Sequence, residues 1–125
     1  ECLLGSNIIY HYSKLNMKPP SIGSKVEWHQ DLSYYPLTNR DSLAVLIYLD
    51  DATKYNGCLK ILPAFHKEPL MNHSKNGIFH GMIVDDIDYS SSIDIEGKAG
   101  TAIFMNCMTH RIHQIKINLI NLDVH

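Results

Sequence analysis

Short apolar runs, and runs in which apolar and polar residues alternate, recur along the chain between Gly, Pro, Asn and Asp residues. Runs of this length and period are typical of β-strands, whose successive side chains point to opposite faces. The pattern predicts strands over residues 7–17, 25–29, 43–49, 58–62, 78–84, 101–105 and 114–122. No window of twelve or more residues has a helical period, so we expect an all-β fold.

Turn residues suggest how these strands are connected. Segments 18–24 and 63–77 are predicted to be loops, and Asn56-Gly57 is predicted to form a tight turn because both residues tolerate positive φ. The strands on either side of that turn could form a hairpin. About seven short strands joined by turns are typical of a sandwich, a barrel or a jelly roll.

Composition narrows the class of protein. A chain of 125 residues with 45% hydrophobic residues is predicted to form one domain over residues 1–125. The formal charge of -2 gives no basic footprint for nucleic acid, and no apolar run reaches the roughly 20 residues of a membrane helix. Three cysteines cannot all pair, which favours a reducing, intracellular and cytoplasmic location.

Histidine and aspartate supply the main candidate for chemistry. The chain lacks phosphate-binding glycine loops, the serine elbow and the H-E-x-x-H motif. In a strand, His29 and Asp31 project from the same face and can reach one metal ion together. Two histidines and one carboxylate on one face of an octahedron leave three positions open, as in non-haem Fe(II) oxygenases. A third ligand must then be a histidine from a distant strand.

The segment from Gly100 to His110 is the best source of that ligand, because it delivers a histidine at the end of an apolar run. His113 follows three residues later, and in an extended chain the two histidines face opposite ways. We favour His110 and keep His113 as the alternative. Cys58 and Cys107 lie in predicted apolar strands and are interpreted as buried hydrophobic residues.

Ordered sequence blocks, spread over about nine-tenths of the chain, point to a family. The blocks are Lys18-Pro19-Pro20, His29 to Pro36, Asn56 to Lys67, Phe79-His80-Gly81 and Gly100 to Phe104. They closely resemble the phytanoyl-CoA dioxygenase family, and most strongly its phytanoyl-CoA hydroxylase branch. The resemblance implies a double-stranded β-helix, a cupin-like jelly roll, that binds Fe(II) and 2-oxoglutarate. It also implies that His29, Asp31 and His110 are the metal ligands.

Some positions depart from the family pattern. The family places an Arg roughly ten residues beyond the distal histidine to pair with 2-oxoglutarate, but Leu119 and Ile120 stand at this distance from His110. Lys14, on the strand where the family lines its cosubstrate pocket, and Lys116 are the predicted substitutes, with Arg111 the other cation nearby. Residues 100–110 are also one residue shorter than the family pattern. Ala64 stands where the family usually has Gly.

The sequence therefore predicts a 2-oxoglutarate-dependent dioxygenase that hydroxylates a small-molecule or lipid-like substrate, which could be an acyl-CoA. Tyr34 and Tyr35 follow the metal pair directly and are predicted to line the substrate mouth, with packing as the alternative role. Two other interpretations stay open. One is a non-catalytic jelly-roll binding module that has lost 2-oxoglutarate binding, and the other is a cupin-type metal enzyme without 2-oxoglutarate. We also expect the jelly roll to be incomplete at its N-terminus.

Overall fold

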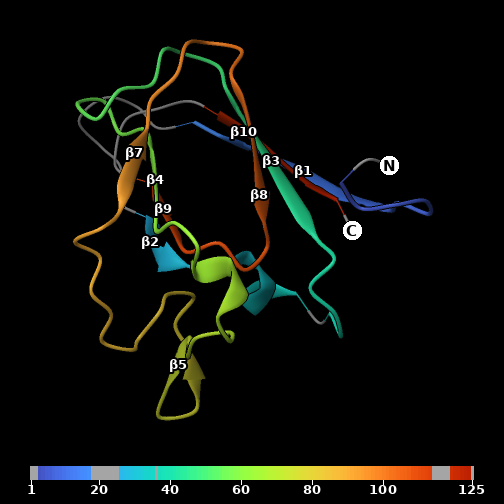
Figure 1. The fold of residues 1–125 in the computed structure, drawn as a ribbon, viewed down its shortest axis with the longest axis vertical. Helices are drawn as coiled ribbons and strands as arrows, with labels where there is room; N and C mark the ends of the chain where they lie inside the picture. Colours follow the sequence, from blue (N-terminus) through green and yellow to red (C-terminus); the bar gives the residue numbers. More distant parts are fainter. Residues whose placement is uncertain (1–2, 18–25, 36, 114–118, 125) are drawn as a thin grey trace.

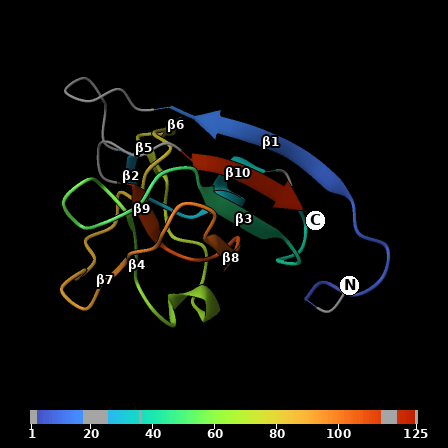
Figure 2. The same ribbon diagram turned by 90° about the horizontal axis from the view of Figure 1, so that it is seen from above.

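Two antiparallel β-sheets face each other in the computed structural model, which describes residues 3–17, 26–35, 37–113 and 119–124. The first sheet has the order β1 (Tyr10–Asn16), β10 (Leu119–Val124), β3 (Leu43–Tyr48) and β8 (Ala102–Asn106). The second has the order β2 (Val26–His29), β9 (Arg111–His113), β4 (Leu59–Ile61) and β7 (Ile93–Ile95). Seen from above, β1 lies at the outer edge of the first sheet (Figure 2). The predicted all-β jelly roll is confirmed.

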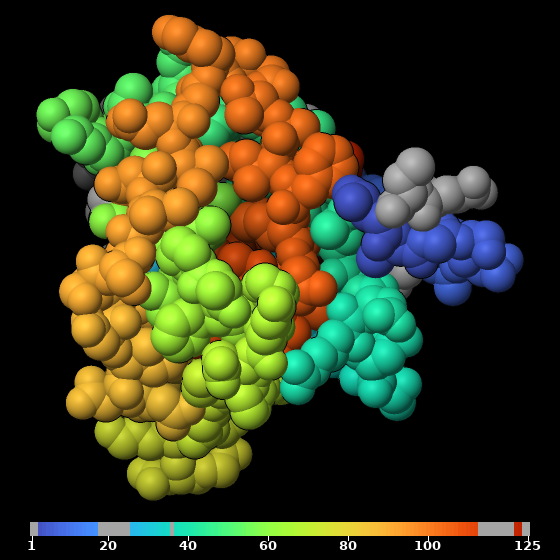
Figure 3. Space-filling model, in the orientation of Figure 1, coloured from blue at the N-terminus to red at the C-terminus, as the bar shows by residue number. Residues whose placement is uncertain are grey.

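A small hairpin of β5 (Ser74–Lys75) and β6 (Ile78–Phe79) lies at one end of the molecule (Figures 1 and 3). Two single-turn 3-10 helices complete the regular structure of the described residues, η1 (Asp31–Tyr34) and η2 (Phe65–Lys67). None of these residues forms an α-helix, as the sequence predicts. The described part of the chain also has no helix with the length and apolar character needed to cross a membrane.

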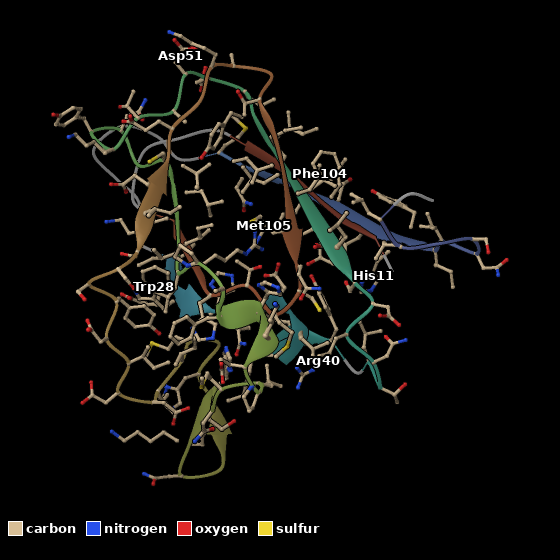
Figure 4. All side chains as sticks on the ribbon, in the orientation of Figure 1. His11, Trp28, Arg40, Asp51, Phe104 and Met105 are labelled. Atoms are coloured by element: carbon tan, nitrogen blue, oxygen red, sulfur yellow. The ribbon has the colours of Figure 1, made fainter. Side chains whose placement is uncertain are left out.

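The core lies between the two sheets and follows the alternation of their strands. On β3 the inward positions are Ala44, Leu46 and Tyr48, each at most 1% exposed, whereas the residues between them are only partly buried. On β8, Met105 faces the core, whereas the neighbouring Phe104 is 57% exposed (Figure 4). This two-residue period appears in burial and not in residue type, because β3 and most of β8 are continuous apolar runs.

Tyr48 connects the two sheets through its buried hydroxyl group. The hydroxyl donates a hydrogen bond to the carbonyl oxygen of Ile95 on β7 (2.7 Å) and accepts one from the amide of Leu59 on β4 (2.9 Å). Burial raises the pKa of Tyr48 to about 12, so the group keeps its proton and can fill both roles.

Two sequence expectations need correction. The Asn56-Gly57 turn forms, with Gly57 at φ 93°, but β3 and β4 lie in different sheets and make no hairpin. The strand predicted over 78–84 ends after β6, and the chain then continues without regular structure. Most of the strand predicted over 114–122 lies outside the described residues, which resume at β10.

Candidate metal centre

A cavity of about 200 Å³ lies between the edge strand β1 of one sheet and strands β2 and β9 of the other. Its wall is formed by Tyr12, Lys14, Asn16, Val26, His29, Asp31, Tyr34, Tyr35 and Arg111. The three residues from β1 are alternate positions of one strand, which therefore share a face. The cavity brings the predicted metal pair together with Lys14, one of the two predicted cosubstrate cations.

His29 is oriented by its own backbone neighbour. Its Nδ1 lies 2.8 Å from the carbonyl oxygen of Glu27. A carbonyl only accepts hydrogen bonds, so Nδ1 carries a proton and Nε2 is the ring nitrogen that faces Asp31. Nε2 lies 3.4 Å from Oδ1 of Asp31, and both side chains are buried. Metal-binding histidines have this arrangement, with one nitrogen held by the protein and the other free for the ion.

Asp31 opens η1 directly after β2 and carries a buried negative charge. Arg111 holds this charge with two hydrogen bonds to Oδ1, from Nε at 3.0 Å and from Nη2 at 2.6 Å. Burial on its own raises the pKa of Asp31, but the charge of Arg111 and the contact with His29 outweigh it and lower the pKa to about 2. The carboxylate is thus ionised at any pH at which it could bind a metal.

His110 lies outside this group. The side chain is fully buried and contacts Phe65 at a ring-centroid distance of 5.4 Å. Neither ring nitrogen has a hydrogen-bond partner among the described residues. The pKa of the ring is lowered mainly by burial and to a smaller extent by the nearby His73. His110 does not line the cavity, and within the described part of the chain no three His, Cys, Asp or Glu side chains group around one point. The structure therefore brings His29 and Asp31 together without His110.

Strand alternation explains which neighbour faces the cavity. Arg111 is the backbone partner of His29 across β2 and β9, and it lines the cavity beside it. His110 is one residue earlier, and adjacent residues of an extended chain point to opposite sides. The backbone of His113 pairs with Val26 and Leu59, while its side chain lies outside what the structure describes. The identity of the third ligand stays a prediction.

The other predicted residues fall in different places. Tyr34 and Tyr35 line the cavity, where the Tyr34 hydroxyl donates to the carbonyl of Gly81 and the Tyr35 hydroxyl lies 2.9 Å from that of Tyr12. Lys116 lies outside the described residues. Trp28, next to His29 on β2, stacks on Tyr89 at 4.2 Å instead of entering the cavity (Figure 4). Cys58 and Cys107 are buried free thiols, as expected.

Gln30, which sequence reasoning overlooked, fixes the backbone between the two metal-pair residues. Its side chain is fully buried, donating to the carbonyl of Met108 (3.0 Å) and accepting from the amide of Met71 (2.8 Å). Its own amide donates to Nε2 of His73 (3.1 Å). These partners are 41 to 78 residues away, so no local pattern in the sequence could reveal them.

Buried Asp123 is a second carboxylate near the cavity that sequence reasoning did not single out. It is the backbone partner of Tyr12 across β1 and β10. Burial, and then the charge of Asp31, raises its pKa. The contacts that place Asp123 here come from a strand pairing of distant segments, which the local pattern does not specify.

Comparison with known proteins extends these observations. The family model described as phytanoyl-CoA dioxygenase (PhyH) matches residues 1–114. A Stutzerimonas stutzeri protein named "Probable alpha-ketoglutarate-dependent hypophosphite dioxygenase" is 49% identical over 70 residues, 56% of this chain and 24% of that protein. Human peroxisomal phytanoyl-CoA dioxygenase is 31% identical, covering 85% of this chain and 34% of its own length. Methylphosphonate hydroxylase from Gimesia maris is also 31% identical, covering 83% and 38%. The chain thus spans about a quarter to two-fifths of these relatives.

Solved structures agree on the fold. EvdO2 from Micromonospora carbonacea var. aurantiaca, complexed with 2-oxoglutarate, is 26% identical with a TM-score of 0.74 and covers 94% of this chain and 51% of its own. The non-heme monooxygenase ThoJ in its apo form gives a TM-score of 0.83 at 22% identity, covering 98% and 48%. With a family match over residues 1–114, a jelly roll and the His29–Asp31 pair at its cavity, the chain belongs to the phytanoyl-CoA dioxygenase family.

Proposed function

We propose that this chain is the jelly-roll part of an Fe(II)- and 2-oxoglutarate-dependent dioxygenase that hydroxylates a small-molecule or lipid-like substrate. The observation that carries the proposal is the 3.4 Å approach of His29 Nε2 to Asp31 Oδ1 at a cavity wall, in a chain of this family. An imidazole nitrogen and a carboxylate oxygen are two of the three donors of a facial iron site. The relative EvdO2 was solved in complex with 2-oxoglutarate.

His29 and Asp31 would hold the iron, and their donor atoms fit this role. His29 Nδ1 is held by the carbonyl of Glu27, which leaves Nε2 as the nitrogen to bind a metal ion, and the carboxyl of Asp31 is ionised. The third ligand would come from His110 or His113. The sequence favours His110 and keeps His113 as the alternative. When bound, iron and 2-oxoglutarate would supply the oxidising power that hydroxylates the substrate.

Cationic side chains would position the cosubstrate. Lys14 and Arg111 both line the cavity, and the Nη1 of Arg111 has no hydrogen-bond partner among the described residues. An ammonium group can bind the far carboxylate of 2-oxoglutarate as a point charge, in place of the bidentate Arg that the family uses. Lys116 is retained as the other candidate from the sequence.

Tyr34 and Tyr35 would contact the substrate, since both line the cavity close to His29. The relatives' names include a phytanoyl-CoA, a hypophosphite and a methylphosphonate enzyme, so their substrates share a phosphorus oxyanion group and differ greatly in size. A cavity of about 200 Å³ suits a small molecule or the reacting end of a longer one. An acyl-CoA is therefore one candidate among several.

A non-catalytic binding module is the second candidate. The observation in its favour is Arg111, which already occupies Asp31 Oδ1. A jelly roll that kept the cavity but left the carboxylate paired with Arg111 would bind small anions without oxidising them.

Turnover of 2-oxoglutarate in the full-length protein distinguishes the two candidates. With Fe(II) and O2, wild type should form succinate, and Asp31→Ala should form none, with Asp86→Ala as the exposed matched control. Lys14→Met should raise the apparent KM for 2-oxoglutarate roughly ten- to a hundred-fold, because it removes a charge-assisted contact with the cosubstrate. Lys75→Met, which changes an exposed lysine outside the cavity wall, should leave it unchanged. No succinate from protein that demonstrably binds iron would favour the binding module.

Alanine variants of the two histidines identify the third ligand. Removal of the ligand should abolish iron binding, because a facial site with one histidine and one carboxylate is incomplete. Iron binding that survives His110→Ala but not His113→Ala would assign His113, and the reverse result would assign His110.

A further inference from the structure

The Asp31 oxygen that faces His29 already accepts hydrogen bonds from the guanidinium of Arg111. Arg111 donates to this Oδ1 from both Nε (3.0 Å) and Nη2 (2.6 Å), and His29 Nε2 lies 3.4 Å from the same atom. All three residues are only 5% exposed. A metal ion bound between His29 Nε2 and this Oδ1 would compete with Arg111 for the lone pairs of that oxygen.

The position of Arg111 in the fold makes this overlap direct. Arg111 is the register partner of His29 on the neighbouring strand, so both side chains leave the sheet at the same level. Among the described residues, Asp31 is the carboxylate with which Arg111 pairs, and its Nη1 is buried without a partner. Asp31 therefore holds the guanidinium at this place by hydrogen bonds, and the charge of Arg111 also acts on the nearby Asp123.

We propose that Arg111 is an internal substitute for the metal ion: it neutralises Asp31 in the metal-free chain and must leave the carboxylate when a divalent cation binds. The inference rests on the His29–Asp31 metal pair of the proposed function. Two cations that share one carboxylate oxygen in a buried site repel each other and compete for the same lone pairs. Arg111 thus lowers the affinity of the site for metal and allows the chain to fold without it.

Removing the guanidinium should consequently tighten metal binding. Arg111→Met keeps most of the apolar stem and removes the charge and its hydrogen bonds. From the strength of charge-assisted hydrogen bonds we expect the affinity of Arg111→Met for the metal ion to rise about 10- to 100-fold. Arg111→Lys keeps the charge but loses the planar two-pronged contact, so its gain should be smaller.

Co(II) titration of the full-length protein tests the inference, because the visible absorption of bound Co(II) reports its ligands without turnover. Wild type, Arg111→Met, Arg111→Lys and Asp31→Ala are compared. Arg40→Met is the matched control, since Arg40 is exposed and lies outside the cavity wall (Figure 4). We expect Arg111→Met to bind most tightly, Arg40→Met to match wild type, and Asp31→Ala to lose binding.

Thermal unfolding gives a second readout. Arg111→Met should melt below wild type without metal, because it leaves a buried carboxylate unpaired, and should gain more than wild type when Co(II) is added. If Arg111→Met does not fold without metal, the Co(II) affinity of Arg111→Lys relative to wild type tests the inference.

Two results would overturn the inference, and they differ in what else they affect. Equal Co(II) affinity in wild type and both Arg111 variants, with binding still lost in Asp31→Ala, would overturn the competition and leave the metal site intact. Absence of Co(II) binding in wild type and every folded variant would remove the metal site of the proposed function and the inference together.

Discussion

A buried carboxylate that stays charged, such as Asp31, makes stability depend on pH. Its pKa falls from the ordinary value of 3.8 to about 2 in the folded chain, since Arg111 and His29 outweigh the opposing effect of burial. A carboxyl whose pKa is lower in the folded chain stabilises the fold at pH values above its pKa in the unfolded chain. This contribution disappears as the pH falls through the pKa of the folded chain. The relevant window is therefore about pH 4 to pH 2.

We predict that urea unfolding of the metal-free protein resolves this contribution. The free energy of unfolding of wild type relative to Asp31→Asn should rise by about 2 kcal/mol between pH 2 and pH 4 and stay level above pH 5, at 1.36 kcal/mol per pKa unit. The exposed Asp86→Asn serves as the control. A constant difference between wild type and Asp31→Asn across this range would mean that Arg111 does not stabilise the Asp31 charge.

Gly81 provides a second test at the scale of one residue. Gly81 and Gly77 both have positive φ, at 67° and 75°, so alanine is strained at either position by roughly 1–2 kcal/mol. A Cβ on Gly81 would also lie 2.6 Å from the Tyr34 hydroxyl oxygen, whereas one on Gly77 would meet nothing within 4 Å. Gly81→Ala should therefore move Tyr34 from the cavity wall.

The expected loss of stability in urea unfolding is larger for Gly81→Ala than for Gly77→Ala by about 1 kcal/mol, the value of the Tyr34 hydrogen bond. Equal losses in the two variants would show that Tyr34 is not held by Gly81.

At the scale of elements, η2 begins with an unfavourable residue. Ala64 precedes this 3-10 helix in a left-handed conformation, with φ 68° and ψ -12°. An L-residue in this region costs about 1–2 kcal/mol, which glycine would relieve. The greater entropy of glycine in the unfolded chain offsets about half of that gain. Ala64→Gly should raise the free energy of unfolding by about 0.5–1 kcal/mol.

Ala99→Gly is the control for this change. Ala99 lies in a turn of the described chain without positive φ, so glycine there should lower stability by about 0.5–1 kcal/mol. If both substitutions lower the stability measured by urea unfolding, the left-handed conformation of Ala64 carries no strain.

The strands that the sequence predicts best include short apolar runs with polar residues at both ends. β3 is such a run between Ser42 and Asp50, and its predicted bounds of 43–49 are within one residue of those observed. β9 has only three residues and follows an apolar run, so no period marks it. The hairpin predicted around Asn56 fails because turn chemistry favours a reversal but does not decide which sheet receives the next strand.

The candidate site was predictable where its residues are neighbours in sequence. His29 and Asp31 are two residues apart: His29 ends β2, Gln30 is extended and Asp31 opens η1, so the local chain brings the two side chains together. Arg111 and Gln30 take their roles from strand register and from partners more than 40 residues away, which the local pattern does not contain. A shift of one residue along β9 exchanges the faces of His110 and Arg111, so the sequence could favour a ligand but not assign its direction.

At the scale of the whole molecule, the two sheets are joined by the Tyr48 hydroxyl. Tyr48→Phe keeps the ring in the core and leaves the Leu59 amide and the Ile95 carbonyl without this partner. An orphaned buried polar group costs about 1–3 kcal/mol, so we expect the variant to lose at least this much free energy of unfolding. Tyr55→Phe, which changes an 84% exposed tyrosine in the same way, is the control. Equal stabilities of the two variants in urea would contradict the connection.

The same hydroxyl also makes the Leu59 amide a reporter of how the fold opens. The Leu59 amide belongs to the sheet of β4, but it donates its hydrogen bond to the Tyr48 side chain of the other sheet. Tyr48 ends β3 and Leu59 begins β4, so solvent can exchange that proton only when the contact between these two strand ends opens. In wild-type protein the Leu59 amide should therefore be protected from deuterium exchange, and its exchange rate measures how often the two sheets part at this point.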